Sequence, residues 1–262
     1  MIPIHDENPL RRTPWVTWLL VAANVVVFLL TPAVRETGVQ NPTPAQICRD
    51  EAFYDQYAAI PRELVTNKPL PTVPSGEVVG TAAGPACAAQ PPPYQKTPFL
   101  SVLFSMFLHG GWLHLLGNML FLWIFGNNVE DRFGHLGYAF FYVLCGYVAA
   151  YGFALANSGS FQPLIGASGA IAGILGAYLA LYPRVRVWSL VPFLFFIPLR
   201  LPVWLVLGLW FVLQWLYSAG IAVSDAGSVA YLAHVIGFVF GFLVARPFRR
   251  AQPQTQASRA SF

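Results

Sequence analysis

The sequence predicts an all-α polytopic membrane protein, a bundle of six transmembrane helices with a short, recessed fourth helix. Three observations predict this class. Of the 262 residues, 56% are hydrophobic and only 10% are charged, whereas soluble domains carry about 25% charged residues. Six apolar segments are long enough to cross most of a bilayer. Arginines gather in alternate connections between these segments. The composition excludes a disordered chain and makes an ordinary cytosolic enzyme a poor fit.

The expected spans follow from the need for about 20 mostly apolar residues to cross hydrocarbon about 30 Å thick. They cover residues 15–31, 111–126, 136–156, 168–182, 201–222 and 229–245, and the fifth lies within an apolar stretch starting at Val187. The spans define an N-terminal tail (1–14), a membrane domain (15–246) with an enlarged first outer loop (32–97), and a C-terminal tail (247–262). The C-terminal tail is rich in Gln, Ser and Ala, which predicts disorder.

The basic residues orient the bundle. Arginines precede the first span and follow the second, fourth and sixth spans, whereas the connections 157–167 and 223–228 contain no Lys or Arg. Basic loops favour the cytoplasmic side, so both termini are expected there, and we expect a multi-pass protein of a bacterial plasma (inner) membrane. Alternatively, the first apolar run is a cleaved signal peptide, which would leave five spans and put the basic loops outside.

The first outer loop is the one long polar insert. Thr43 to Gln46 forms a capping-box pattern that predicts one short helix. Cys48 and Cys87 both lie on the oxidising side, where they could form a disulfide or remain two free thiols. Residues 82–93 are of low complexity. The apolar segment 99–108, which ends at His109-Gly110-Gly111, is expected to lie along the outer interface or to dip into it.

Four polar side chains share one depth in the membrane. At 1.5 Å per helical residue from the next cytoplasmic arginine, Ser168 lies at roughly 24 Å, His234 at roughly 18 Å, and His114 and Asn118 at roughly 27 and 21 Å. The fourth span has only 15 residues, so its N-terminus should begin below the outer surface, inside the protein. Three helices that run in the same direction could bring these side chains together.

This constellation indicates nucleophilic catalysis. Ser168 would be the nucleophile and His234 its general base, and no Asp or Glu is available at this level as a third member. The Ser168 amide, Asn118 and His114 are the available oxyanion donors, and Gly166 and Gly169 flank the nucleophile in the same expected oxyanion and substrate-binding pocket. No metal and no cofactor is expected, and no basic stripe suggests nucleic acid.

Each of these residues also has a structural interpretation. Ser168 can be a small packing residue beside Gly169 and Gly173, and His234 can bond a neighbouring carbonyl. His114 and Asn118, four residues apart, can bridge helices. The spacing of Gly237 and Gly241 predicts close contact of the sixth helix with a partner, for which the glycine-rich fourth helix is the natural candidate. His109 is either adjacent to the catalytic residues or an interface residue.

The chain resembles the rhomboid intramembrane serine proteases. The matching segments, in the family's order, are His109–Asn118, Glu130–Gly134, Gly166–Ala170, and Ala233-His234 with Gly237 and Gly241. The resemblance implies a six-helix core with a water-filled cavity open to the outside, a Ser168–His234 dyad, and oxyanion roles for His114, Asn118 and the Ser168 amide. It also implies that the substrate is a single-span membrane protein cleaved near the outer face. The fifth helix and the loop near 224–228 would form the gate.

Two departures from the family pattern are visible. Some members stack an aromatic side chain, four residues after the nucleophile, on the catalytic histidine; here that position is Ala172, so Tyr231 and Phe238 are the candidate replacements. The Trp-Arg pair common in the family's first outer loop is missing between Pro32 and Thr97. Two other functions compete with proteolysis: a catalytically silent relative that binds transmembrane segments, and a small transporter or channel. Against the transporter stand the lack of an intramembrane carboxylate and of an inverted repeat.

Overall fold

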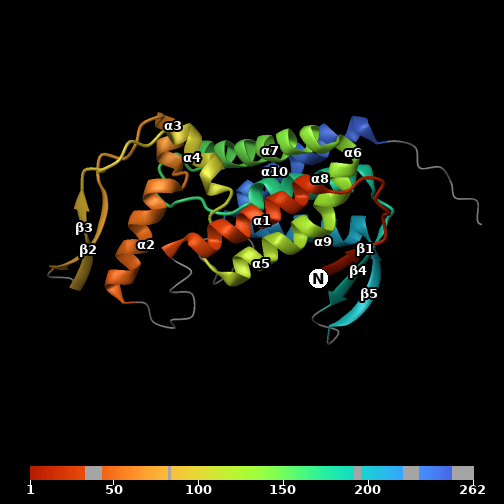
Figure 1. Cartoon of the computed structure of the whole chain (residues 1–262), viewed down its shortest axis with the longest axis horizontal. Helices are drawn as coiled ribbons and strands as arrows, with labels where there is room; N and C mark the ends of the chain where they lie inside the picture. Colours follow the sequence, from red (N-terminus) through yellow and green to blue (C-terminus); the bar gives the residue numbers. More distant parts are fainter. Residues whose placement is uncertain (33–42, 82–83, 192–195, 221–229, 250–262) are drawn as a thin grey trace, which may run out of the picture.

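The computed structural model describes residues 1–32, 43–81, 84–191, 196–220 and 230–249. Most of these residues are helical, and the long helices run roughly along the same axis (Figure 1). The apolar helices are α1 Trp15–Leu30, α7 His135–Ala156, α8 Ser168–Leu181, α9 Val203–Ser218 and α10 Tyr231–Ala245. Each overlaps a predicted span. Helix α9, which corresponds to the fifth predicted span (201–222), is shorter than predicted, since it ends at Ser218.

The second predicted span is longer than its apolar pattern suggested. Helix α5 Trp112–Phe121 continues through a π-helical turn, Leu122–Gly126, into α6 Asn127–Phe133. The buried carboxylate of Glu130 on α6 accepts hydrogen bonds from the amides of Val16 and Thr17 at 2.9 and 2.7 Å. Glu130 therefore caps the N-terminus of α1 from another helix and ties the first helix into the bundle.

Two of the described helices meet a length and composition test for membrane crossing: His135–Ala156, with 22 residues, and Tyr231–Phe248, with 18. Helices α1, α8 and α9 are apolar but shorter, at 16, 14 and 16 residues. At 1.5 Å per residue, α8 measures about 21 Å, less than a hydrocarbon core of about 30 Å. The short fourth helix thus agrees with the sequence prediction.

Helices α8 and α10 pack backbone against backbone. A Cβ on Gly241 would collide with the carbonyl of Gly173, and a Cβ on Gly176 would collide with the carbonyl of Phe238. The glycine spacing read from the sequence therefore marks a real helix–helix contact, and the partner is the predicted one. This contact fixes how the N-terminal ends of α8 and α10 face each other.

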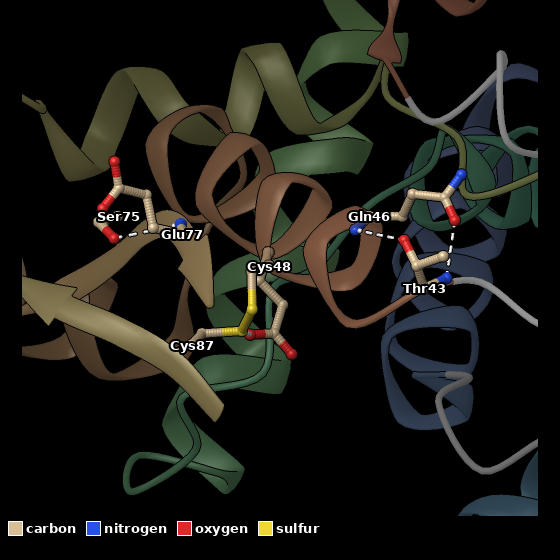
Figure 2. Close-up of a disulfide and its surroundings, with 7 residues drawn as sticks. Thr43, Gln46, Cys48, Ser75, Glu77 and Cys87 are labelled. Carbon is tan, nitrogen blue, oxygen red and sulfur yellow. Dashed lines mark hydrogen bonds between the residues drawn. A yellow bond between two sulfur atoms is a disulfide. The ribbon is translucent and has the colours of Figure 1, made fainter. Parts of the chain in front are cut away.

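The outer loop folds into more structure than the single helix predicted. We call residues 43–96 the cap. It contains α2 Pro44–Tyr57, α3 Pro61–Thr66, and a hairpin of β2 Val73–Thr81 and β3 Gly84–Gln90, which lies at one end of the molecule (Figure 1). Strand β3 falls within the low-complexity segment. The capping box is confirmed, and Cys48 and Cys87 form a disulfide that joins α2 to β3 (Figure 2).

A buried ion pair also holds the cap together. The ammonium group of Lys96 lies 2.7 Å from the carboxylate of Glu63, and both side chains are almost inaccessible to solvent. Glu63 also accepts a hydrogen bond from the amide of Leu70 at 2.9 Å. Burial lowers the pKa of Lys96, and the hydrogen bond to Glu63 opposes that shift.

A small sheet lies at the opposite end of the bundle from the cap (Figure 1). Its three antiparallel strands, in the order β1 Ile2–Asp6, β4 Arg186–Val191 and β5 Ile197–Pro202, correct two expectations. The fold is not purely α-helical, and the apolar stretch from Val187 begins as strands because it pairs with the N-terminal residues. Buried Asp6 anchors this sheet to the helices, since it accepts hydrogen bonds of 2.7 Å from Asn128 and Tyr178. The tail after Phe248 lies almost entirely outside the described residues.

Candidate active site

Ser168 and His234 lie in direct contact. Ser168 is the first residue of α8 and His234 is in the first turn of α10, and the close packing of these helices brings their N-terminal ends together. The Ser168 Oγ atom lies 2.7 Å from Nε2 of His234. At this distance the hydroxyl can donate its proton to the imidazole, as a nucleophile–base pair requires.

The contacts of the second imidazole nitrogen of His234, Nδ1, and of its ring were not predicted. Nδ1 of His234 lies 2.7 Å from Oε1 of Gln214 on α9. Trp210, one turn earlier on α9, places its ring centroid 6.1 Å from the imidazole with an angle of 32° between the planes. Tyr231 approaches edge-on at 6.4 Å, as one of the two predicted candidates, whereas the Phe238 ring contacts Trp210 and Phe211. The signal that could have found Gln214 is its amide within an otherwise apolar helix.

His114 and Asn118 lie beside the loop that leads to the nucleophile. A Cβ placed on Gly166 would lie 2.7 Å from Nε2 of His114 and 3.7 Å from Nδ2 of Asn118. Nδ2 of Asn118 is buried and finds no acceptor among the described residues. A buried donor without a partner is costly unless something else occupies its place, so this atom is available to a ligand oxygen.

Gly166 takes a backbone conformation that favours glycine, with φ of +113°. Its amide donates to the carbonyl of Ser105 at 2.9 Å, so that this N–H is already used. The missing side chain of Gly166 is what lets His114 approach. At Gly169, by contrast, the space of a Cβ is taken by Ala149 on α7, which makes Gly169 a packing residue here. The expected share of Gly169 in the oxyanion pocket stays a prediction.

His109 is buried, and its position at the membrane interface stays a prediction. Its ring lies against that of His114, with centroids 4.9 Å apart in an edge-to-face arrangement. The carbonyl of His109 accepts a hydrogen bond of 3.3 Å from the hydroxyl of Tyr54 in the cap. His109 therefore lies between the cap and His114.

An open cavity of about 1190 Å³ connects these groups. Ser168, His234, Asn118 and His114 line it at one part, and Tyr54 and Asp55 of α2 line it at another. Desolvation raises the pKa of Asp55 to about 6, with Lys96 opposing the shift. The cap thus forms part of the wall of the same cavity that contains the Ser–His pair.

The cap also holds the segment in front of the nucleophile. Ala59, just after α2, accepts a hydrogen bond from Leu164 at 2.7 Å and donates one of 2.5 Å to the hydroxyl of Ser105. The carbonyl of Ser105 accepts the amide of Gly166. The position of Gly166 is therefore set from the cap and from helix α4 Pro98–Ser105, as well as by α8.

Two expectations fall on other parts of the chain. The gate loop near 224–228 lies outside the described residues. Among the described residues, no group of three or more His, Cys, Asp or Glu side chains could hold a metal ion.

The described residues form a mostly helical structure with several apolar helices, and comparison with known proteins gives its family and, with the family, a polytopic helical membrane fold. A model of the Rhomboid domain matches residues 96–251, more than half of the chain. The chain therefore belongs to the rhomboid family. The matched region begins where the cap ends.

Relatives in plants and yeast agree with this family. The chain is 30% identical over 182 residues to RHOMBOID-like protein 5 of Arabidopsis thaliana, covering 67% of this chain and 54% of the relative. It is 29% identical over 151 residues to Rhomboid protein 1, mitochondrial, of Saccharomyces cerevisiae, covering 56% and 41%. RHOMBOID-like protein 6, mitochondrial, of Arabidopsis is 27% identical over 210 residues, covering 74% and 63%.

The chain spans about half the length of the curated relatives it matches. As a member of the rhomboid family it is an integral membrane protein, as the sequence predicted. The expectation of a bacterial plasma membrane is not supported, because two of these relatives are named as mitochondrial.

Proposed function

We propose that this protein is an intramembrane serine endopeptidase in which Ser168 is the nucleophile and His234 is the general base. The observation that carries the proposal is the 2.7 Å contact between Ser168 Oγ and His234 Nε2. Membership of the rhomboid family supports the same reaction class. The cavity supports it too, since hydrolysis needs water at the serine and the cavity reaches Ser168 from outside the helix bundle.

The proposed reaction has two steps. The Ser168 oxygen attacks the scissile carbonyl while its proton moves to Nε2 of His234, and the imidazolium then gives this proton to the leaving amine. Water, deprotonated by the same imidazole, next attacks the acyl ester and releases the carboxylic acid and the serine hydroxyl. Asn118, His114 and the unpaired first amide of α8 would stabilise the oxyanion in both steps.

The proposed substrate is the transmembrane segment of a single-span membrane protein, cut near the face of the membrane where the cap lies. In this proposal α1, α5–α6, α7, α8, α9 and α10 are the six spans of a domain covering 15–246. The N-terminus and the C-terminal end of α10 lie on the face opposite the cap (Figure 1). The arginine-bearing strands β4 and β5 lie at that end of the bundle, as the charge rule requires for the cytoplasmic side (Figure 1).

Labelling and cleavage together test the proposal. The purified protein in proteoliposomes should cleave a reporter transmembrane substrate, and Ser168→Ala and His234→Ala should each abolish cleavage while the protein stays folded. A fluorophosphonate probe should label Ser168 only when His234 is present. The matched control is Ser218→Ala, which removes a hydroxyl that donates a hydrogen bond to the carbonyl of Trp215 at the C-terminal end of α9. Cleavage by Ser168→Ala would overturn the assignment, and substrate binding without cleavage or labelling would favour a silent membrane binder.

A further inference from the structure

We propose that Gln214 is a positioning residue of this site, whose side-chain carbonyl selects the tautomer and fixes the ring of His234. The proposal rests on the proposed function, because it concerns how the base is prepared. It assigns to α9 a direct part in the catalytic arrangement, which a serine–histidine dyad alone does not include.

The argument begins with the two nitrogens of the imidazole. A neutral histidine carries one ring proton, and only the nitrogen without it can accept the serine proton. Nε2 faces Ser168 Oγ, and Nδ1 faces Oε1 of Gln214, each at 2.7 Å. A carbonyl oxygen can only accept, so this contact keeps the proton on Nδ1 and leaves Nε2 free to act as the base.

The surroundings of Gln214 fix its side chain. Trp210, Gln214 and Tyr217 are spaced i, i+4 and i+7, so they lie along one face of α9. Trp210 packs near the imidazole, and Tyr217 stacks on Tyr231 with centroids 4.9 Å apart. The amide is therefore held between two aromatic contacts that dock α9 against α10. Such packing limits the rotamers of Gln214 and keeps its carbonyl on Nδ1.

This arrangement also explains how the site tolerates Ala172. A methyl group on α8 cannot stack on the imidazole, and Ala172 is fully buried in the helix packing. The contacts that orient the ring come from α9 and from Tyr231 instead. The orientation of the base thus depends on the docking of α9, while the nucleophile is fixed separately through α8.

An amide is a weaker partner than a carboxylate, and the difference can be measured. Gln214 fixes the tautomer but adds no negative charge to stabilise the imidazolium, unlike the acid of a triad. Among the residues that the structure describes, the groups placed against this ring are His114 on α5, Ser168 on α8 and Tyr231 on α10, beside Gln214 and Trp210 of α9. No Asp or Glu of the described residues is among these partners. A carboxylate at position 214 would therefore be a new charge beside the imidazole.

Two variants test the proposal in proteoliposomes. Gln214→Leu removes the acceptor at similar volume, and it should lower kcat by about 10- to 100-fold with little change in KM. Gln214→Glu restores an acceptor in a water-accessible cavity. It should regain most of kcat and move the acid limb of the pH–rate profile up by about one pH unit, because the carboxylate stabilises the imidazolium. Val212→Leu, on an exposed part of α9, is the matched control and should behave like the wild type.

The outcomes separate this inference from the proposed function. Fluorophosphonate labelling of Ser168 in the wild type, together with slow labelling in Gln214→Leu and recovery in Gln214→Glu, supports the positioning role. Wild-type rates in Gln214→Leu would overturn it. So would an unchanged acid limb in Gln214→Glu, because a carboxylate that accepts the Nδ1 proton must stabilise the imidazolium. Absence of labelling in the wild type would instead refute the proposed protease function itself.

Discussion

The replacement Gly166→Ala tests the geometry of the oxyanion pocket. The new Cβ would lie 2.7 Å from Nε2 of His114, and ordinary contacts begin at 3.4 Å, so the imidazole must retreat by about 0.7 Å. Oxyanion donors act at about 2.7–3.1 Å, so that retreat moves His114 out of range. Loss of one such donor lowers kcat by about 100- to 1000-fold.

Stability should fall as well. An alanine at φ of +113° costs about 1–3 kcal/mol, and crowding against His114 adds about as much again. Gly208→Ala is the matched control, because nothing lies within 4 Å of a Cβ at that position on α9. Cleavage of the reporter substrate and thermal unfolding in detergent are the two measurements. If Gly166→Ala unfolds cooperatively and keeps kcat within about threefold of the wild type, the oxyanion reasoning is refuted.

Three further predictions concern the stability of the cap and of α1. Replacing Cys48 and Cys87 by serine opens a loop spanning 39 positions and should destabilise the cap by about 4 kcal/mol, seen as rapid proteolysis within residues 43–96; equal protease resistance would contradict this. Glu130→Gln weakens the capping of α1 and should lower the free energy of unfolding by about 1–3 kcal/mol, measured by thermal unfolding. The neighbouring Asp131→Asn is the control and should lower it by less than about 0.5 kcal/mol. Desolvation raises the pKa of half-buried Asp55 from 3.8 to about 6. The folded cap therefore binds this proton more tightly than the unfolded chain does, and the cap should lose stability as the pH rises from about 4 to about 6. Asp55→Asn should abolish that slope and stabilise the cap at pH 7 by about 1 kcal/mol, after allowance for solvent screening; a slope that persists in the variant would assign it to another group.

Hydropathy was enough to locate most of the helices. The bounds of α7, α8 and α10 differ from the predicted spans by one or two residues, because a bilayer demands long apolar runs and the flanking arginines and prolines mark their ends. The β4–β5 hairpin could not be predicted in this way, since a short apolar run reads equally well as strand or helix. Pro198 and Pro202, inside the run, were the available sign against a continuous helix.

Depth in the membrane located the Ser–His pair, and the same rule explains why Gln214 was missed. The depth comparison used only the three helices that run in one direction. Gln214 follows Arg200 by 14 residues on a helix that runs the other way, which also gives a depth of roughly 21 Å. The rule applied to every span would have placed it beside His234. The sequence named Cys48 and Cys87 as a possible disulfide but left two free thiols as the alternative, and it did not predict the hairpin of the cap, because both depend on tertiary contacts that local pattern does not encode.

Three different elements fix the three chemical parts of this site. Glycine contacts between α8 and α10 hold Ser168, the proposed nucleophile, and α9 contacts His234, the proposed base, through Gln214. Ala59 of the cap, which bonds Ser105 of α4, holds the segment that precedes Ser168. Because each of the three uses separate contacts, damage to one should leave the others in place. A loosened cap should slow the reaction without altering the acid limb of the pH profile, whereas Gln214→Glu should move that limb with the cap intact. The disulfide between α2 and β3 thus stabilises the cap, and the cap in turn positions Gly166 through Ala59 and Ser105. Both cysteines lie outside the residues that match the family model.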